Sequence, residues 1–167
     1  AMMMLLAAGR RMKLMNRMAA EGNWWHGRPI LSEVPRLYGQ TLGLLAFGNV
    51  SRCMARRAKA FGMNIISHDP YLSELTISES GVEPVSFNEL LERSDYLSIH
   101  APHNEDTHHI IDASALAKMP NHSVLINSAR GPLIDEIALI DALQKGEIAA
   151  AGLDVLEKEP PEKDNPL

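Results

Sequence analysis

The sequence predicts an α/β domain in which a parallel, doubly wound sheet of about six strands has helices on both faces. Short apolar runs of strand length alternate with segments of helical periodicity from residue 41 to residue 156. Strands that alternate with helices of about ten residues are typical of parallel sheets covered on both sides. The chain has 167 residues, of which 46% are hydrophobic and 22% charged, so it fits one ordinary globular domain.

The expected elements follow one another in a regular order. Residues 1–20 are expected to form an amphipathic helix, and residues 21–40, rich in glycine and proline, a surface loop. Residues 49–61 have apolar side chains at helical spacing, and residues 135–146 begin with an acidic turn and end at a glycine, as capped helices do. Further helices are expected around 87–94 and 112–119. The expected strands are the apolar runs at 41–47, 63–68, 82–86, 96–100, 123–127 and 149–156.

The charge pattern and the single cysteine exclude several classes of protein. A net charge of −5 and a pI near 5.8 leave no basic footprint for nucleic acid, and Arg52, Arg56, Arg57 and Lys59 are interpreted as a solvated helix face. Cys53 is the only cysteine and is expected to pack, so no intrachain disulfide can form. The apolar start precedes its basic residues, the reverse of a signal peptide, and is too short to span a bilayer. We therefore expect a cytoplasmic protein without nucleic-acid or membrane partners.

The first strand runs into the next helix through the loop AFGNVS at 46–51. A dinucleotide-binding fingerprint has glycines at the first, third and sixth of these positions, and only Gly48 matches. Gly48 is the position at which the backbone approaches a diphosphate while the N–H groups of the helix face its charge. Ala46 still permits a compact turn, and Ser51 is small enough to let the helix approach the strand. A plain strand-to-helix turn could have the same sequence, so this loop alone does not distinguish a dinucleotide-binding site from such a turn.

An acidic residue at the end of the second strand strengthens the dinucleotide interpretation. Asp69 lies 69 − 48 = 21 residues after Gly48, where an acid accepts hydrogen bonds from the adenosine ribose. Its carboxylate would repel a 2′-phosphate, and no Arg or Lys stands in the HDPY sequence at 68–71, so NAD is favoured over NADP. The alternative is that Asp69 only starts the turn before Pro70.

Three long stretches resemble the signatures of the D-2-hydroxyacid dehydrogenase family. They are TLGLLAFGNVSRCMARRAKAFGMNIISHDP, LLERSDYLSIHAPHNEDTHHIID and INSARGPLIDEIALIDALQKGEIAAAGLDVLEKEPP, which together cover much of the chain. Ser51 departs from the glycine usual in the family. The resemblance implies a Rossmann-type NAD-binding domain over residues 1–167, beginning in the helix that connects two domains. It also implies an enzyme that transfers hydride between NAD and a small D-2-hydroxy acid or 2-oxo acid.

The same resemblance implies roles for residues at the strand ends. Arg130 corresponds to the substrate-binding arginine, whose planar guanidinium grips a carboxylate through paired bonds. Glu159 corresponds to the catalytic glutamate, which raises the pKa of a histidine that exchanges a proton with the substrate. Asp154 corresponds to the acid that contacts the nicotinamide carboxamide. The other implied cofactor contacts are Gly48, Asn49, Val50, Asp69, His100, Pro102, Thr107 and Ala129.

The catalytic histidine of the family follows the Glu-Pro motif, and this sequence has no histidine there. We therefore expect residues 1–167 to lack the flanking substrate domain and the catalytic-histidine segment, and to be inactive alone. His108 and His109 are neighbours on a segment expected to be extended, where adjacent side chains point apart, so no metal site is expected. The histidines, all before Arg130, are His26, His68, His100, His103, His108, His109 and His122.

Other interpretations of these residues stay open. One is an NAD-sensing, corepressor-like binding protein on the same fold, against which Arg130 and Glu159 weigh. Another is a remnant that has lost its cofactor, as the loss of glycine at Ala46 and Ser51 would suggest. Formate dehydrogenases fit less well, because they have an amide side chain at the place of Glu159. The sequence does not identify which 2-hydroxy acid would be the substrate.

The methionine-rich first helix has more apolar residues than one stripe needs. They are Met2, Leu5, Leu6, Met12, Met15 and Met18. We therefore expect a homodimer with this helix near the interface, as the family resemblance also implies. The alternative is an ordinary core helix in which methionine fills space.

Overall fold

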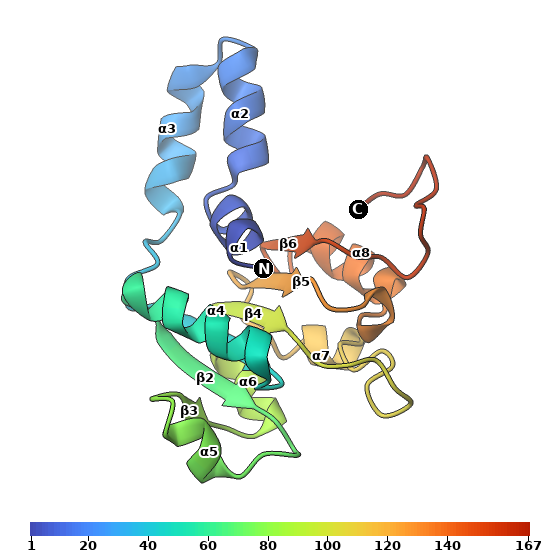
Figure 1. The fold of residues 1–167 in the computed structure, drawn as a ribbon. Coiled ribbons are helices and arrows are strands. Elements are labelled where there is room, and N and C mark those ends of the chain that lie inside the picture. The colour runs from blue at the N-terminus through green and yellow to red at the C-terminus, as the bar shows by residue number, and fades with distance from the viewer.

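The structure is a computed structural model that describes the backbone of residues 1–167 and the side chains outside positions 28 and 31–33. Its centre is a six-stranded, fully parallel sheet with the order β3-β2-β1-β4-β5-β6 (Figure 1). The strands are β1 (Thr41–Leu45), β2 (Asn64–His68), β3 (Glu83–Pro84), β4 (Tyr96–Ile99), β5 (Val124–Asn127) and β6 (Ala150–Leu153). The helices are α1 (Met2–Gly9), α2 (Met12–Ala20), α3 (Trp24–Glu33), α4 (Asn49–Ala60), α5 (Glu74–Ser78), α6 (Phe87–Arg93), α7 (Ala113–Leu116), α8 (Glu136–Lys145) and the 3₁₀ turn η1 (Gly131–Leu133).

Two hydrophobic cores cover the two faces of the sheet. On one face, α1 contributes Leu5, α4 contributes Met54 and α5 contributes Ile77, all packed against strand residues such as Leu44. On the other face, buried residues of α6, α7 and α8 pack against the opposite sides of the same strands. The doubly wound parallel sheet predicted from the alternating pattern is therefore confirmed. Each strand is one to four residues shorter than its apolar run.

The N-terminal region differs from the sequence expectation. Residues 1–20 form two helices rather than one, because Arg11 takes a left-handed conformation with φ of 49° and turns the chain between them. The expected loop at 21–40 contains the helix α3, even though Pro29 lies inside it. Its Gly27 is buried, and a β-carbon there would lie 3.3 Å from the sulfur of Met15. Close packing of α3 on α2 therefore outweighs the local preference of glycine and proline for turns.

Local capping explains a helix that the sequence pattern missed. Ser73 accepts a hydrogen bond from the Thr76 backbone N–H at 3.3 Å and starts the one-turn helix α5. At the start of α6, Ser86 and Glu89 form a reciprocal capping box.

Within the described residues, no helix is both long and apolar enough to cross a membrane.

Candidate functional site

The candidate site residues predicted from the sequence gather at one edge of the sheet. Parallel register aligns the last residues of neighbouring strands, Leu45 with Ile99, Ile99 with Asn127, and Asn127 with Leu153. The loops that leave these ends therefore meet at the carboxyl edge, where open α/β sheets bind ligands. They carry Gly48 and Asp69 after β1 and β2, His100, Pro102 and Thr107 after β4, Ala129 and Arg130 after β5, and Asp154 and Glu159 after β6.

The loop after β1 leaves open space in front of the helix α4. Gly48 is the N-cap residue of α4, and a β-carbon built on it would meet nothing within 4 Å. No side chain caps this helix end, so the N–H groups of its first turn, including those of Asn49 and Val50, are available to an anion. Gly48 has an ordinary φ of −78°. Glycine is therefore needed at position 48 for the absence of a side chain and not for an unusual backbone conformation.

Ala46, and not Gly48, adopts the left-handed backbone conformation that normally favours glycine. Ala46 has a φ of 70°, in the left-handed region. Its carbonyl oxygen accepts a hydrogen bond of 2.6 Å from the hydroxyl of Ser51, which is fully buried beneath the loop. The small size of Ser51 was evident from the sequence, but this bond was not, because the pairing depends on the fold of the loop.

Asp69 supports the loop as well as the turn that follows β2. Its Oδ2 accepts a hydrogen bond from the backbone N–H of Phe47 at 2.8 Å, and its Oδ1 accepts one from Tyr71 at 2.9 Å. The bond to Tyr71 is the turn considered as the alternative for this residue. Because each carboxylate oxygen accepts more than one hydrogen bond, Asp69 can hold the turn and still accept from a ribose hydroxyl.

The loop after β4 is closed by its own polar groups. Thr107 donates from Oγ1 to the carbonyl oxygen of Pro102 at 2.8 Å. His100 lies 3.0 Å from the hydroxyl of Ser98 through Nε2. Burial lowers the pKa of His100 to about 4. His100 is therefore neutral at physiological pH.

The histidines of this loop do not lie as expected from the sequence. The rings of His108 and His109 stack with centroids 4.0 Å apart, and His103 Nε2 lies 3.1 Å from His108 Nδ1. The expectation that neighbours point apart was wrong, because His109 has a φ of 51° and the segment is a turn and not an extended strand. His109 also pairs with Glu157, which ties this loop to the segment after β6.

The loop after β5 is shaped by two residues for which the sequence did not predict a role. The buried side chain of Asn127 donates to the carbonyl oxygen of Arg130 at 2.8 Å and accepts from the N–H of Ala129 at 3.0 Å. Gly131 packs on the backbone of Leu156, whose carbonyl oxygen would lie 2.0 Å from a β-carbon there. Both residues stand beside Arg130 in the motif INSARG, which was the only signal for them. The Arg130 side chain itself is exposed.

Asp154 and Glu159 share a pocket at the end of β6. The pocket has a volume of about 410 Å³ and is otherwise lined mainly by apolar side chains. The N–H of Asp154 donates to the carbonyl oxygen of Asn127 at 2.9 Å, and Glu159 accepts from the N–H of Leu156 at 3.0 Å. Through Gly131 and Asn127, this acidic pocket and the exposed Arg130 lie on adjoining loops.

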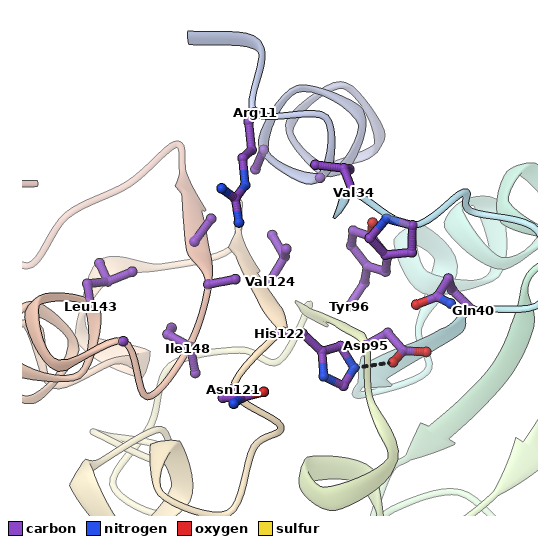
Figure 2. Close-up of a pocket in the computed structure, with 16 residues that line it drawn as sticks. Arg11, Val34, Gln40, Asp95, Tyr96, Asn121, His122, Val124, Leu143 and Ile148 are labelled. Atoms are coloured by element: carbon purple, nitrogen blue, oxygen red, sulfur yellow. Dashed lines mark hydrogen bonds and ion pairs between the residues drawn. The ribbon is translucent and has the colours of Figure 1, made fainter. Parts of the chain in front are cut away.

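A second pocket lies at the opposite, amino edge of the sheet (Figure 2). There the Asp95 carboxylate accepts from the N–H of Thr41 at 2.7 Å and pairs with His122 at 2.7 Å. These bonds link the start of β1 to the residues just before β4 and β5. Arg11 enters the pocket from the turn after α1. The predicted site residues all lie at the other edge, so we interpret this pocket as a junction that holds the sheet together.

An open glycine at a helix N-terminus, an acid at the end of the next strand and this strand order define a dinucleotide-binding domain. Comparison with known families agrees. Residues 2–167 match the profile described as "D-isomer specific 2-hydroxyacid dehydrogenase, NAD binding domain". The chain belongs to the D-isomer specific 2-hydroxyacid dehydrogenase family, and the resemblance noted in its three sequence motifs is confirmed.

Similar proteins carry several related names. The chain is 42% identical to the glyoxylate reductase of Korarchaeum cryptofilum over 98% of this chain and 50% of that protein. It is 44% identical to the D-3-phosphoglycerate dehydrogenase of Methanocaldococcus jannaschii over 98% of this chain and 31% of the relative. A crystal structure of a glyoxylate reductase from Paecilomyes thermophila matches with a TM-score of 0.85 and 39% identity, covering 99% of this chain and 49% of that one. The D-lactate dehydrogenase with NAD+ from Lactobacillus jensenii matches with a TM-score of 0.85 and 31% identity, over 93% of this chain and 46% of that one. The chain thus spans half or less of the length of these relatives.

Proposed function

We propose that this domain binds NAD as part of an enzyme that transfers hydride between NAD and a D-2-hydroxy acid or its 2-oxo acid. The observation that carries the proposal is the open cradle at Gly48, on the same sheet edge as Asp69, Arg130 and Glu159. NAD, when bound, supplies the nicotinamide that accepts or gives the hydride. The residues of the chain supply the binding surface, the orientation of the substrate and the control of its proton.

The adenosine half of the cofactor would lie along β1 and β2. The free N–H groups at Gly48, Asn49 and Val50 would face the diphosphate, since the first turn of α4 has no side-chain cap. Asp69 would accept from the ribose hydroxyls. Its negative charge, without a basic residue in 68–71, disfavours the 2′-phosphate of NADP. Ala129, His100, Pro102 and Thr107 would line the path toward the nicotinamide, and Asp154 would accept from its carboxamide.

The substrate would be held at the loops after β5 and β6. Arg130 would grip the carboxylate of the acid with its guanidinium fork. Glu159 would pair with a histidine and raise the pKa of that histidine, so that it exchanges a proton with the substrate oxygen. Since the chain spans about half of its relatives, we propose that the histidine and the substrate-binding half belong to the remainder of a longer protein.

The N-terminal helices support a proposed homodimer. The hairpin of α2 and α3 stands away from the sheet in Figure 1, and none of the described side chains of α2 is buried. Trp24 and Trp25 on α3 are 63% and 70% exposed. Large apolar side chains on a projecting element are typical of a protein interface. We place the interface on this hairpin and expect the protein in the cytoplasm.

Titration calorimetry of residues 1–167 with NAD and with NADP tests the cofactor assignment. We expect NAD to bind at least tenfold more tightly, because Asp69 repels the extra phosphate. Equal affinity for the two cofactors, or no binding of NAD, would contradict it. The activity is tested separately in the longer protein with several 2-oxo acids and NADH. We expect turnover that Arg130→Gln reduces by at least a hundredfold, because the bidentate carboxylate grip is lost, and turnover unaffected by that change would refute the role of Arg130.

A further inference from the structure

The buried Ser51 occupies a position where the dinucleotide fingerprint has its last glycine. Its hydroxyl donates to the carbonyl oxygen of Ala46 at 2.6 Å, and its side chain is fully buried. Ala46, where the fingerprint has its first glycine, takes the left-handed φ of 70°. A residue with a β-carbon adopts this conformation only at an energetic cost. The two departures from the fingerprint are therefore bonded to each other.

We propose that Ser51 is a positioning residue for the cofactor, whose hydroxyl holds the Ala46 turn in the conformation that presents Gly48 and the start of α4 to the diphosphate. The proposal rests on the binding of NAD at this edge, and it assigns to Ser51 a role that a glycine does not fill. In this loop the serine compensates for the β-carbon of Ala46.

The peptide between Ala46 and Phe47 is held from both ends. Its carbonyl oxygen accepts from Ser51, and its N–H donates to Asp69 Oδ2 at 2.8 Å. Because a peptide unit is planar, bonds at its two ends fix its orientation. The N–H of Ala46 also donates to the carbonyl oxygen of His68 at 2.8 Å. Without Ser51, the carbonyl end of this unit would lose its side-chain anchor, and the turn could relax away from the strained conformation.

A serine in this place could instead donate directly to the diphosphate. A hydroxyl has one proton to donate, and that of Ser51 is committed to Ala46 in a short bond. The complete burial of Ser51 also removes it from the surface that a diphosphate would touch. The geometry therefore favours an indirect role, and the two roles predict different results when Ala46 is changed.

A double-mutant cycle separates these roles. NAD and ADP are titrated by calorimetry, and adenosine by NMR, into the wild type, Ser51→Ala, Ala46→Gly and the double variant. We expect Ser51→Ala to weaken NAD and ADP by about fivefold, as for the loss of one hydrogen bond, and to leave adenosine unchanged. In the double variant we expect affinity within about twofold of the wild type, because glycine adopts the turn unaided.

Ser67 provides a matched control. Its hydroxyl is equally buried and donates to the carbonyl oxygen of Leu44 at 2.8 Å, away from the loop. Ser67→Ala should lower the melting temperature without changing the affinity for NAD. If Ser51→Ala does not fold, Ser51→Gly gives the same comparison, with and without Ala46→Gly.

Three results would overturn the proposal. One is an unchanged NAD affinity in Ser51→Ala, which would make the serine purely structural. Another is a deficit that persists in the Ala46→Gly background, which would indicate direct contact with the diphosphate. The third is an equal loss of adenosine binding, which would indicate general damage to the site and not a displaced turn.

Discussion

The two edges of the sheet are held together in different ways. At the amino edge, Asp95 bonds Thr41 and His122 and joins the starts of three strands. At the carboxyl edge, side chains such as Asp69 and Asn127 bond the backbone of the loops, and Arg130, Asp154 and Glu159 remain exposed. The amino edge therefore uses its polar side chains to join strands, while the carboxyl edge uses some of them to shape loops and leaves others available to a ligand.

Gly131→Ala, at the carboxyl edge, should lower the free energy of unfolding more than the other substitutions. A β-carbon there would lie 2.0 Å from the Leu156 carbonyl oxygen, and the segment cannot easily withdraw because the Glu157 N–H is bonded to Glu136 at 2.6 Å. We expect urea unfolding to show a loss of about 3 kcal/mol. A change below about 0.5 kcal/mol would show that this contact does not shape the edge.

Gly48→Ala is the matched control for that substitution. The added β-carbon meets nothing within 4 Å, so the free energy of unfolding should stay within about 0.5 kcal/mol of the wild type. The methyl group would instead occupy the proposed diphosphate space and weaken NAD at least tenfold in a calorimetric titration. Together the two glycines distinguish a structural from a binding role on the same edge.

His100 should make the stability of the carboxyl edge depend on pH. Burial lowers the pKa of His100 to about 4, against about 6.5 in an unfolded chain. The unfolded chain therefore binds more protons between these values, and stability falls as the pH drops from about 6.5 toward 4. Between pH 7 and pH 4.5 the wild type should lose about 2 kcal/mol more than His100→Gln, measured by urea unfolding. An identical pH dependence in both proteins would contradict the burial of a neutral His100.

Asp95→Ala should act on the amino edge alone, with the smallest effect. It removes the acceptor of the Thr41 N–H and the partner of His122. We expect a loss of about 1.5 kcal/mol in the free energy of unfolding, with the affinity for NAD unchanged. Weaker NAD binding in this variant would show that the two edges are coupled through the strands.

The sequence predicted the sheet and the edge at which the candidate residues gather, because strand alternation and motif position are local signals. It did not predict α3, since the packing of Gly27 on Met15 is a tertiary contact that overrides a pattern typical of loops. The stacking of His108 on His109 was also missed, because a positive φ at a histidine has no signal in the sequence. The bond from Ser51 to Ala46 needed the folded loop. In the sequence, the only sign of this bond was that Ala46 and Ser51 stand where the fingerprint has glycines.

The double role of Asp69 has a consequence for cofactor engineering. Exchanging Asp69 for a neutral or basic residue would remove the charge that repels the 2′-phosphate of NADP. Here that exchange would also release the Phe47 amide, whose 2.8 Å bond to Asp69 shapes the turn before the helix. A successful redesign must keep an acceptor for that amide, for example through Asp69→Asn with a basic residue introduced at a neighbouring position such as Tyr71.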